Sequence, residues 1–429
     1  MSLQRNALLM MLLTGLLGIL GQWDTSLARA WCLPAALLLL GLSYEAWTLG
    51  RCELQLSLSG PARWLLGRLQ TVRFVFRQER CHVLIVQVAL SAPEVFASQP
   101  SLATLRLARG AEAAAELAVR ARRLGRYTWP TPQLRVCGLL KLAWWPRTVT
   151  ADYACAVVPD VVSRARRIAG DLSRGEQRAR GPGSGAEILQ LRDYRHGDPW
   201  RAIDWKASAR RGHLISRELA EERRLEILIA IDAGRTSTLA AGEIDRLGLY
   251  VNVAARLAQR AAELDDAVGA LVFAERPLLL LPPRRGAASA ARIRAALTAC
   301  TAHQGDSNPA LAAARIRAAS PRRTLVVLLT DLQDASTEEL VQAVRLLTPK
   351  HFALIGALEN PAIATLPRAA AADPLDPYRV LAATEYHNAL AANVRALRAL
   401  GAAALTARPE HLDAAVCNAY REFRRHRRI

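Results

Sequence analysis

Lysine is almost absent from this chain of 429 residues, which contains only Lys141, Lys206 and Lys350. Arginine therefore supplies nearly all of the 57 basic side chains, which against 38 Asp and Glu residues give a formal net charge of +19. Aromatic residues are also scarce, at 5%, and none of the nucleic-acid recognition motifs is present. A bias toward Arg and Ala can follow from nucleotide composition alone. The positive charge by itself therefore does not indicate a nucleic-acid partner.

Motifs of the common enzyme classes are also missing. The sequence has no GxSxG and no HExxH motif, and its eight histidines are scattered. Covalent catalysis needs a nucleophile with a base in reach, so we expect no enzyme. The seven cysteines include no CxxC pair and are odd in number. This argues against a zinc site or a disulfide framework and favours a reducing compartment.

Hydrophobic residues are abundant, at 52%, which excludes a disordered chain, and two long apolar runs stand at the start. Residues 7–23 carry no charge, and residues 30–49 carry only Glu45. A membrane-spanning helix needs about 20 apolar residues, within a range of about 17 to 25. The sequence therefore predicts a transmembrane helical hairpin over residues 1–50, which contacts the bilayer through residues 7–49. A secretory signal peptide is the alternative for the first run.

The charges around these runs predict the orientation of the hairpin. More arginines follow the second run than precede the first or lie between the two. Positive charge favours the cytoplasmic side, so both ends of the hairpin are expected inside, with the soluble domains cytoplasmic.

The middle of the chain changes character twice. Residues 51–160 alternate apolar and polar side chains between Pro and Gly turns, which predicts a small β-sandwich-like module. Residues 161–185 are dense in Arg and Gly and predict a linker or an exposed arm near anionic lipid. The glycines do not form a phosphate loop, because no apolar strand precedes them and no Gly-Lys-Ser/Thr follows.

Residues 225–429 have the pattern of an α/β domain. Apolar runs of strand length alternate with helical periodicity, and these runs cover residues 225–231, 268–273, 277–281, 324–329, 352–358 and 402–406. Such alternation predicts a mostly parallel, doubly wound sheet with helices on both faces. Asp232 and Asp331 close two of the runs, and ligands bind at the carboxyl ends of such strands. A hard cation could use both carboxylates.

Between the linker and this domain lies a polar segment, residues 186–224. Charges of both signs are interleaved with tyrosine and tryptophan. One hypothesis is a network of bidentate hydrogen bonds that fixes the loop, in which the arginines Arg192, Arg201 and Arg210 pair with Asp193, Asp198, Asp204 or Glu218. The other is a solvated loop followed by a charged helix. Spacing alone does not separate the two.

This segment resembles the signature of the bacterial family named domain of unknown function fifty-eight. The pattern is R-x-Y-x-x-G-D-x-x-R-x-I-D-W-K-x-S-A-R followed by x-x-x-L-x-x-R-E-L. It is carried here by Arg192, Tyr194, Gly197, Asp198, Arg201, Ile203, Asp204, Trp205, Lys206, Ser208, Ala209, Arg210, Leu214, Arg217 and Glu218. The resemblance extends over the apolar runs, the strand-rich module and the α/β domain.

What the resemblance implies is a protein of the bacterial inner membrane with a von Willebrand factor A-like domain. The partner it implies is a MoxR-type AAA+ ATPase, or other proteins of the same operon. The leading hypothesis is therefore a membrane-anchored interaction or scaffold protein for the assembly or remodelling of a client complex. The alternatives are a basic protein that contacts the membrane surface or nucleic acid, and an uncharacterised enzyme.

The resemblance also implies a Mg²⁺ site of the adhesion type, and Mg²⁺ is the only cofactor it suggests. In von Willebrand factor A-like domains the first strand ends in D-x-S-x-S, and a later Thr and a further Asp complete the site. The corresponding residues here are Asp232, Thr236, Ser307 and Asp331. Gly234 takes the place of the first serine and Arg235 adds positive charge, so the site should be weakened. The alternative is a degenerate loop in which the two aspartates make only structural hydrogen bonds.

Overall fold

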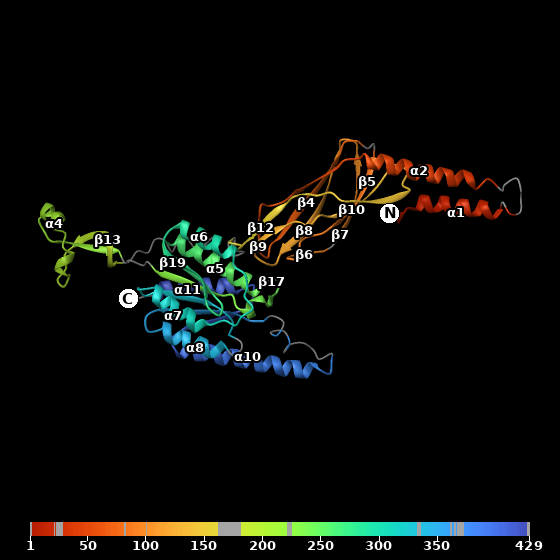
Figure 1. The fold of residues 1–429 in the computed structure, drawn as a ribbon. Helices are drawn as coiled ribbons and strands as arrows, with labels where there is room; N and C mark the ends of the chain where they lie inside the picture. Colours follow the sequence, from red (N-terminus) through yellow and green to blue (C-terminus); the bar gives the residue numbers. More distant parts are fainter. Residues whose placement is uncertain are drawn as a thin grey trace. The chain divides into compact units, whose positions relative to one another are not determined.

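The computed structural model describes residues 2–20, 22, 29–80, 83–99, 101–161, 182–220, 225–332, 336–360, 363, 366 and 373–426. The chain divides into two compact units, Met1–Pro159 and Asp160–Ile429, shown in Figure 1. The predicted boundaries at 50/51 and 224/225 therefore separate parts within each unit. Most of the predicted linker, residues 161–185, lies outside the described residues, although a strand already begins at Pro182.

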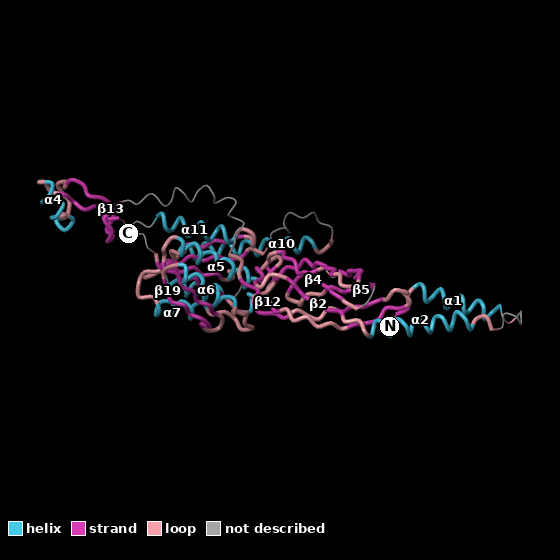
Figure 2. The backbone as a smooth tube through the Cα atoms, turned by 90° about the horizontal axis from the view of Figure 1, so that it is seen from above, coloured by secondary structure: helices cyan, strands magenta, loops and turns pink. Residues whose placement is uncertain are grey.

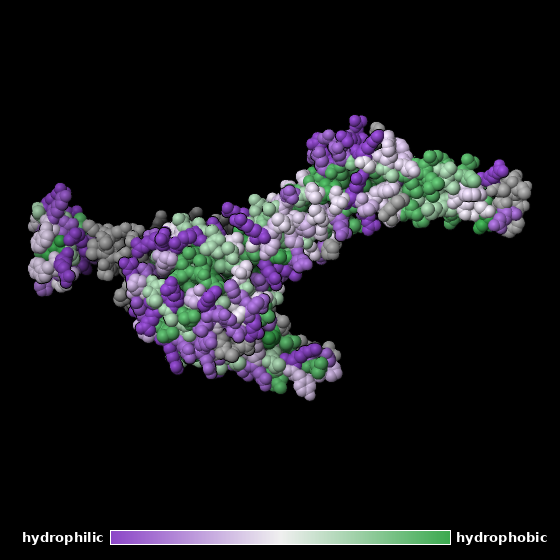
Figure 3. Space-filling view, viewed as in Figure 1, coloured by the Kyte–Doolittle hydropathy of each residue, from purple (hydrophilic) through white to green (hydrophobic). Residues whose placement is uncertain are grey.

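Two apolar helices open the first unit: α1 (Arg5–Leu20) and α2 (Cys32–Gly50). α2 has 19 residues and is long and apolar enough to cross a membrane. α1 is also apolar but has 16 residues, which is shorter than a membrane span requires. Both carry exposed leucines, such as Leu12 at 69% and Leu33 at 71%, and Figure 3 shows a continuous hydrophobic surface along them. The described residues therefore contain one helix of spanning length near the N-terminus, which is weak support for membrane association.

Glu45, the single carboxylate of α2, is buried at 1% exposure. Its two carboxylate oxygens accept hydrogen bonds from the backbone N–H groups of Leu142 at 3.5 Å and Ala143 at 3.3 Å. A buried carboxylate is costly unless it is hydrogen-bonded, so these bonds tie α2 to the strand module of the same unit. The short strand β1 (Ser2–Leu3) adds a second tie, because it pairs with β11 (Ala143–Arg147).

We expect Glu45→Ala to lower the free energy of unfolding of the first unit by about 1–3 kcal/mol, because it leaves two buried N–H donors unsatisfied. Glu45→Gln should lose less, since its side chain keeps an acceptor. Chemical denaturation of the detergent-solubilised protein measures both. The control is Tyr44→Ala on the same helix, whose side chain is 56% exposed; an equal loss there would contradict the role given to Glu45.

The rest of the first unit consists of β-strands in facing sheets, drawn in magenta in Figure 2. One sheet has the order β2-β4-β8-β6, a second β1-β11-β10-β5-β7, and a third β3-β12-β9. Alternate side chains of β4 are buried, as the sequence pattern predicts for a half-buried strand. The rings of Trp64, Phe96 and Trp129 pack between 5.4 and 5.9 Å apart in the core.

The bounds of the remaining strands in this module are β2 (Leu54–Ser59), β3 (Arg63–Leu65), β4 (Leu69–Gln78), β5 (Val83–Leu90), β6 (Phe96–Ser98), β7 (Ser101–Ala108), β8 (Glu112–Ala121), β9 (Gly125–Thr128), β10 (Gln133–Cys137) and β12 (Ala154–Val158).

The second unit contains a six-stranded sheet of order β19-β18-β15-β20-β21-β22. All neighbours are parallel except β19, which runs antiparallel to β18 at the edge. The strands are β15 (Glu226–Asp232), β18 (Ala267–Phe273), β19 (Pro277–Arg284), β20 (Leu325–Leu329), β21 (Phe352–Leu358) and β22 (Ala403–Ala407). Each coincides with one of the six predicted runs, so the predicted doubly wound α/β domain is confirmed. Chain order reverses between β15 and β20, which is the switch point where such sheets bind ligands.

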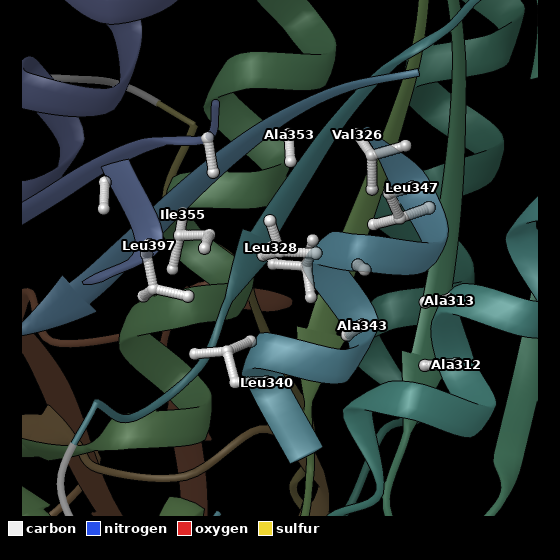
Figure 4. Packing of buried hydrophobic residues seen from close by; sticks show 14 of the residues in the cluster. Ala312, Ala313, Val326, Leu328, Leu340, Ala343, Leu347, Ala353, Ile355 and Leu397 are labelled. Carbon is white, nitrogen blue, oxygen red and sulfur yellow. The ribbon is translucent and has the colours of Figure 1, made fainter. Parts of the chain in front are cut away.

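Helices cover both faces of this sheet, as Figure 1 shows. They are α5 (Arg246–Glu263), α6 (Ala287–Thr298) and α11 (Leu412–His426) on one face, and α7 (Pro309–Ala319), α8 (Ser336–Leu347) and α10 (Asp376–Ala399) on the other. In Figure 4, Val326 of the sheet lies beside Leu347 of α8, and Ile355 of the sheet lies beside Leu397 of α10. A small hairpin, β16 (Ala240–Ala241) and β17 (Ile244–Asp245), leads into α5.

Candidate functional site

The signature segment forms a two-stranded sheet with a short helix of its own. Its strands β13 (Pro182–Asp193) and β14 (Ile215–Ala220) pair antiparallel, and between them lie the turn η2 (Trp200–Ala202) and the helix α4 (Trp205–Arg211). Ile203 and Ile215 are each 1% exposed. These two side chains form the apolar centre around which the polar residues are arranged.

Arg192 is the centre of the charge network. Its Nη1 and Nη2 atoms donate to the two carboxylate oxygens of Asp198 at 2.7 and 2.8 Å, and its Nε donates to Glu218 at 2.7 Å. Hydrogen bonds from Arg192 and from the Arg195 backbone lower the pKa of Asp198 to about 2, while Asp198 and Glu218 raise the pKa of Arg192. A bidentate pair of this kind fixes the loop geometry.

The other polar residues of the signature hold the turn and the helix. The backbone at Gly197 has φ of +105°, a conformation that side chains other than glycine rarely adopt. Asp204 caps α4 by accepting from the Ala207 N–H at 2.9 Å. Ser208 Oγ donates to the Asp204 carbonyl at 2.7 Å and accepts from the Ile215 N–H at 2.8 Å. These bonds join the helix to β14.

The structure therefore realises the network hypothesis for Arg192, with Asp198 and Glu218 as its partners. Asp193 instead lies 2.9 Å from His213 Nε2, a pairing that the sequence analysis missed. The expected pairing of Arg201 and Arg210 within the network is not observed, and both side chains are exposed.

The network leaves several large side chains facing solvent. Trp200 is 71% exposed and Trp205 is 64% exposed, and the Tyr194 ring lies 6.1 Å from that of Trp200. We call the following exposed residues the signature surface: Trp200, Arg201, Trp205, Lys206 and Arg210. Tryptophan is rarely left so exposed, and Trp and Arg dominate binding hot spots, so this surface is the candidate contact region of the segment.

The hydrogen bonds between Arg192 and Asp198 predict that the stability of the signature segment depends on pH. Because the pKa of Asp198 is depressed in the folded protein, its contribution to stability is fully present above its usual pKa of 3.8 and is lost as the pH falls through about 2. Hydrogen exchange of β13 and β14 peptides, corrected for intrinsic rates, should show this loss. In Asp198→Asn protection should already be reduced at neutral pH, and the remaining acid transition should be smaller because only Glu218 still contributes. An unchanged transition in the variant would assign it to another carboxyl group.

A second candidate site lies at the carboxyl ends of β15 and β20, where Asp232 and Asp331 were predicted. Asp232 is 2% exposed. One of its carboxylate oxygens accepts from the Gly234 N–H at 2.9 Å and from the Ser307 hydroxyl. The other accepts from the Thr330 hydroxyl at 2.6 Å. The predicted pair Asp232 and Ser307 is therefore brought together, by a direct hydrogen bond.

Asp331 has a different environment. It is 6% exposed, and its Oδ2 accepts a hydrogen bond from Arg246 Nη1 in an ion pair whose two side chains are almost entirely buried. Tyr250 lies on the same helix as Arg246 and donates to the Thr330 carbonyl at 3.0 Å. Burial first, and the nearby Asp331 charge second, raise the pKa of Tyr250 well above 10, so it stays a neutral donor.

The residues present do not fit a divalent cation. A Cβ at position 234 would overlap the Ser307 hydroxyl, so a serine there, as the metal site needs, would require Ser307 to move. The next predicted ligand, Thr236, lies in the turn η3 (Arg235–Thr238), where Ser237 Oγ donates to the Asp232 carbonyl at 2.7 Å. Across the described ranges no three His, Cys, Asp or Glu side chains gather as a metal centre.

Three residues at this site escaped the sequence analysis: Arg246, Thr330 and Ser237. Thr330 directly precedes Asp331, and that adjacency was a usable signal. Arg246 gave none, because it is 85 residues from Asp331 in sequence and one arginine among many.

Removal of the Arg246 guanidinium should destabilise the second unit strongly, since it leaves Asp331 buried without its counter-charge. For Arg246→Ala we expect the free energy of unfolding to fall by about 3–5 kcal/mol. The matched control is Arg235→Ala, which breaks an ion pair whose side chains are 64% and 82% exposed and should cost about 0–1 kcal/mol. Urea denaturation of the two variants compares them, and similar losses would refute the assignment.

Residues 190–385 of the chain match the family described as "Protein of unknown function DUF58". No curated protein matches the chain. Among solved structures, the conserved hypothetical protein BatB from Bacteroides thetaiotaomicron is similar at 12% identity over 47% of this chain and 99% of its own, with a TM-score of 0.32. An uncharacterized membrane spanning protein from Vibrio fischeri is similar at 13% identity over 47% and 98%, with a TM-score of 0.18. Proximal thread matrix protein 1 from the mussel byssus, in a form with a zinc-occupied MIDAS motif, is similar at 15% identity over 46% and 45%, with a TM-score of 0.28.

Proposed function

We propose that this chain, which matches the DUF58 family over residues 190–385, is a membrane-anchored interaction or scaffold protein that works with a MoxR-type AAA+ ATPase in assembling or remodelling a client complex. The anchor in this proposal is a hairpin of α1 and α2 that spans the inner membrane twice. Both soluble parts then lie in the cytoplasm, where an ATPase and its nucleotide are available. The arginines that follow α2 support this orientation.

The signature surface is the observation that carries this proposal. Arg192, Asp198 and Glu218 hold the loop in one geometry, so Trp200 and Trp205 are presented to solvent without having to be ordered on binding. A preorganised surface loses less entropy on association than a mobile one. Rigid aromatic side chains beside arginine and lysine make a suitable contact for a protein partner with an acidic and apolar face.

A non-enzymatic role agrees with how the buried carboxylates are used. Asp232 accepts from three protein donors, and Asp331 is paired with Arg246, so both serve the fold. The basic tail has a similar role where it is described, because Arg424 on α11 donates to the Leu264 carbonyl at 3.2 Å and lies 3.4 Å from Asp266. The tail arginine is thus engaged within the α/β domain, which weakens the hypothesis of a polyanion contact there.

The proposal is tested by affinity capture of the full-length protein from its native membranes, with the recovered partners identified by mass spectrometry. The wild type should recover an AAA+ ATPase, and Trp200→Ala/Trp205→Ala should reduce the recovery at least tenfold, which corresponds to a loss of about 1.4 kcal/mol in binding free energy. The control is Tyr378→Ala, which removes an equally exposed aromatic ring, at 72% exposure, from α10.

The control should recover the ATPase as the wild type does. Wild-type capture without any ATPase would contradict the partnership. Equal recovery by the wild type and the double tryptophan variant would keep the partnership and remove the signature surface from it.

A further inference from the structure

The second unit has its own positive charge at the place where a von Willebrand factor A-like domain would hold a divalent cation. Two carboxylates, Asp232 and Asp331, lie at the carboxyl ends of the adjacent parallel strands β15 and β20. Two buried negative charges side by side need compensation in a medium of low dielectric constant. Among the described residues, protein groups contact both carboxylates.

Hydrogen bonds from protein donors satisfy both oxygens of the first carboxylate, Asp232. Asp232 receives the Gly234 N–H, the Ser307 hydroxyl and the Thr330 hydroxyl. The loop that carries Ser307 is itself fastened over the end of β15, because the Arg235 N–H donates to the Gly305 carbonyl at 2.9 Å and the His303 N–H to the Ala233 carbonyl at 2.7 Å. The space beside Asp232 is therefore filled by backbone and by the Ser307 side chain.

The second carboxylate, Asp331, is paired with Arg246. Arg246 is the first residue of α5, directly after the N-cap Asp245, whose side chain accepts from the Gly248 N–H at 2.8 Å. The N-terminus of a helix is its positive end, so a buried cation is disfavoured there unless an anion lies against it. Asp331 is that anion, and both side chains of the pair are less than a tenth exposed.

From these contacts we infer that the Arg246 guanidinium is the resident cation of this site, so that the domain is held closed without a divalent ion and has no place to bind one. A bound metal ion would contact both carboxylates at once. Here Arg246 neutralises Asp331, and a separate set of hydroxyl and amide groups satisfies Asp232. The inference does not depend on the proposed ATPase partnership.

Manganese uptake tests the inference on the full-length protein in detergent, with free Mn²⁺ followed by electron paramagnetic resonance. The wild type should take up no Mn²⁺ in a manner that depends on Asp232, so wild type and Asp232→Asn should titrate alike. Arg246→Ala vacates the cation position and frees Asp331, and it should acquire Mn²⁺ binding that disappears in Arg246→Ala/Asp331→Asn. Mn²⁺ should also raise the Tm of Arg246→Ala while leaving that of the wild type unchanged.

Two results would overturn the inference. One is Mn²⁺ uptake by the wild type that is lost in Asp232→Asn, because the site would then bind metal beside the arginine. The other is a folded Arg246→Ala protein that binds no Mn²⁺, because the arginine would then not occupy a cation position.

A double-mutant cycle keeps the inference testable if Arg246→Ala does not fold. The two single variants of the cycle are Arg246→Met and Asp331→Leu. The double variant removes both charges together and should recover most of the Tm lost in either of them, since a buried ion pair can be replaced by apolar side chains. If the double variant loses as much Tm as the two single variants added together, the residues are not coupled and the inference is overturned.

Discussion

The burial of carboxylates at the ends of parallel strands is the constraint on which the second unit depends. The C-terminal ends of β15 and β20 place Asp232 and Asp331 in the interior, where a charge without a partner is strongly destabilising. The loops that surround these residues are organised to satisfy them. Loop 303–308 supplies a hydroxyl, the turn after β15 supplies an amide, and the hairpin β16–β17 brings the first residue of α5 into contact with Asp331.

The same rule operates in the two other parts of the molecule. Burial of the Glu45 carboxylate on an apolar helix is stabilised by two backbone N–H groups of the strand module, which donate hydrogen bonds to its oxygens. Asp198 and Glu218 are held by Arg192, at a more exposed position where the pair serves to set loop geometry rather than to stabilise a core. Arg192 and Arg246 each pair with specific carboxylates, whereas Arg398 donates to the backbone carbonyl of Ala404.

Sequence patterns predicted the α/β domain well because its signals are local. The apolar run 352–358 has the length of a buried strand and lies between segments with helical periodicity, and the structure places β21 over the same residues. The predicted metal site illustrates the limit. Asp232 and Ser307 were paired correctly, but the space that Ser307 occupies beside Gly234 depends on how a loop 75 residues away folds back, and no spacing reveals that. Arg192 was named correctly, yet its pairing with Glu218 depends on the register of β13 and β14, and its pairing with Asp198 depends on the turn after β13.

The sequence by itself determined the apolar helices, the alternation of strands and helices, and the signature that resembles the family matched over residues 190–385, because each of these is written in contiguous residues. Only the tertiary structure decided which charges meet. Arg246 and Asp331 are 85 residues apart and belong to different elements, and their pairing follows from strand order and from where α5 begins. Whether two carboxylates bind a metal or an arginine is a question of which side chain fills a shared space, and that space exists only in the folded protein.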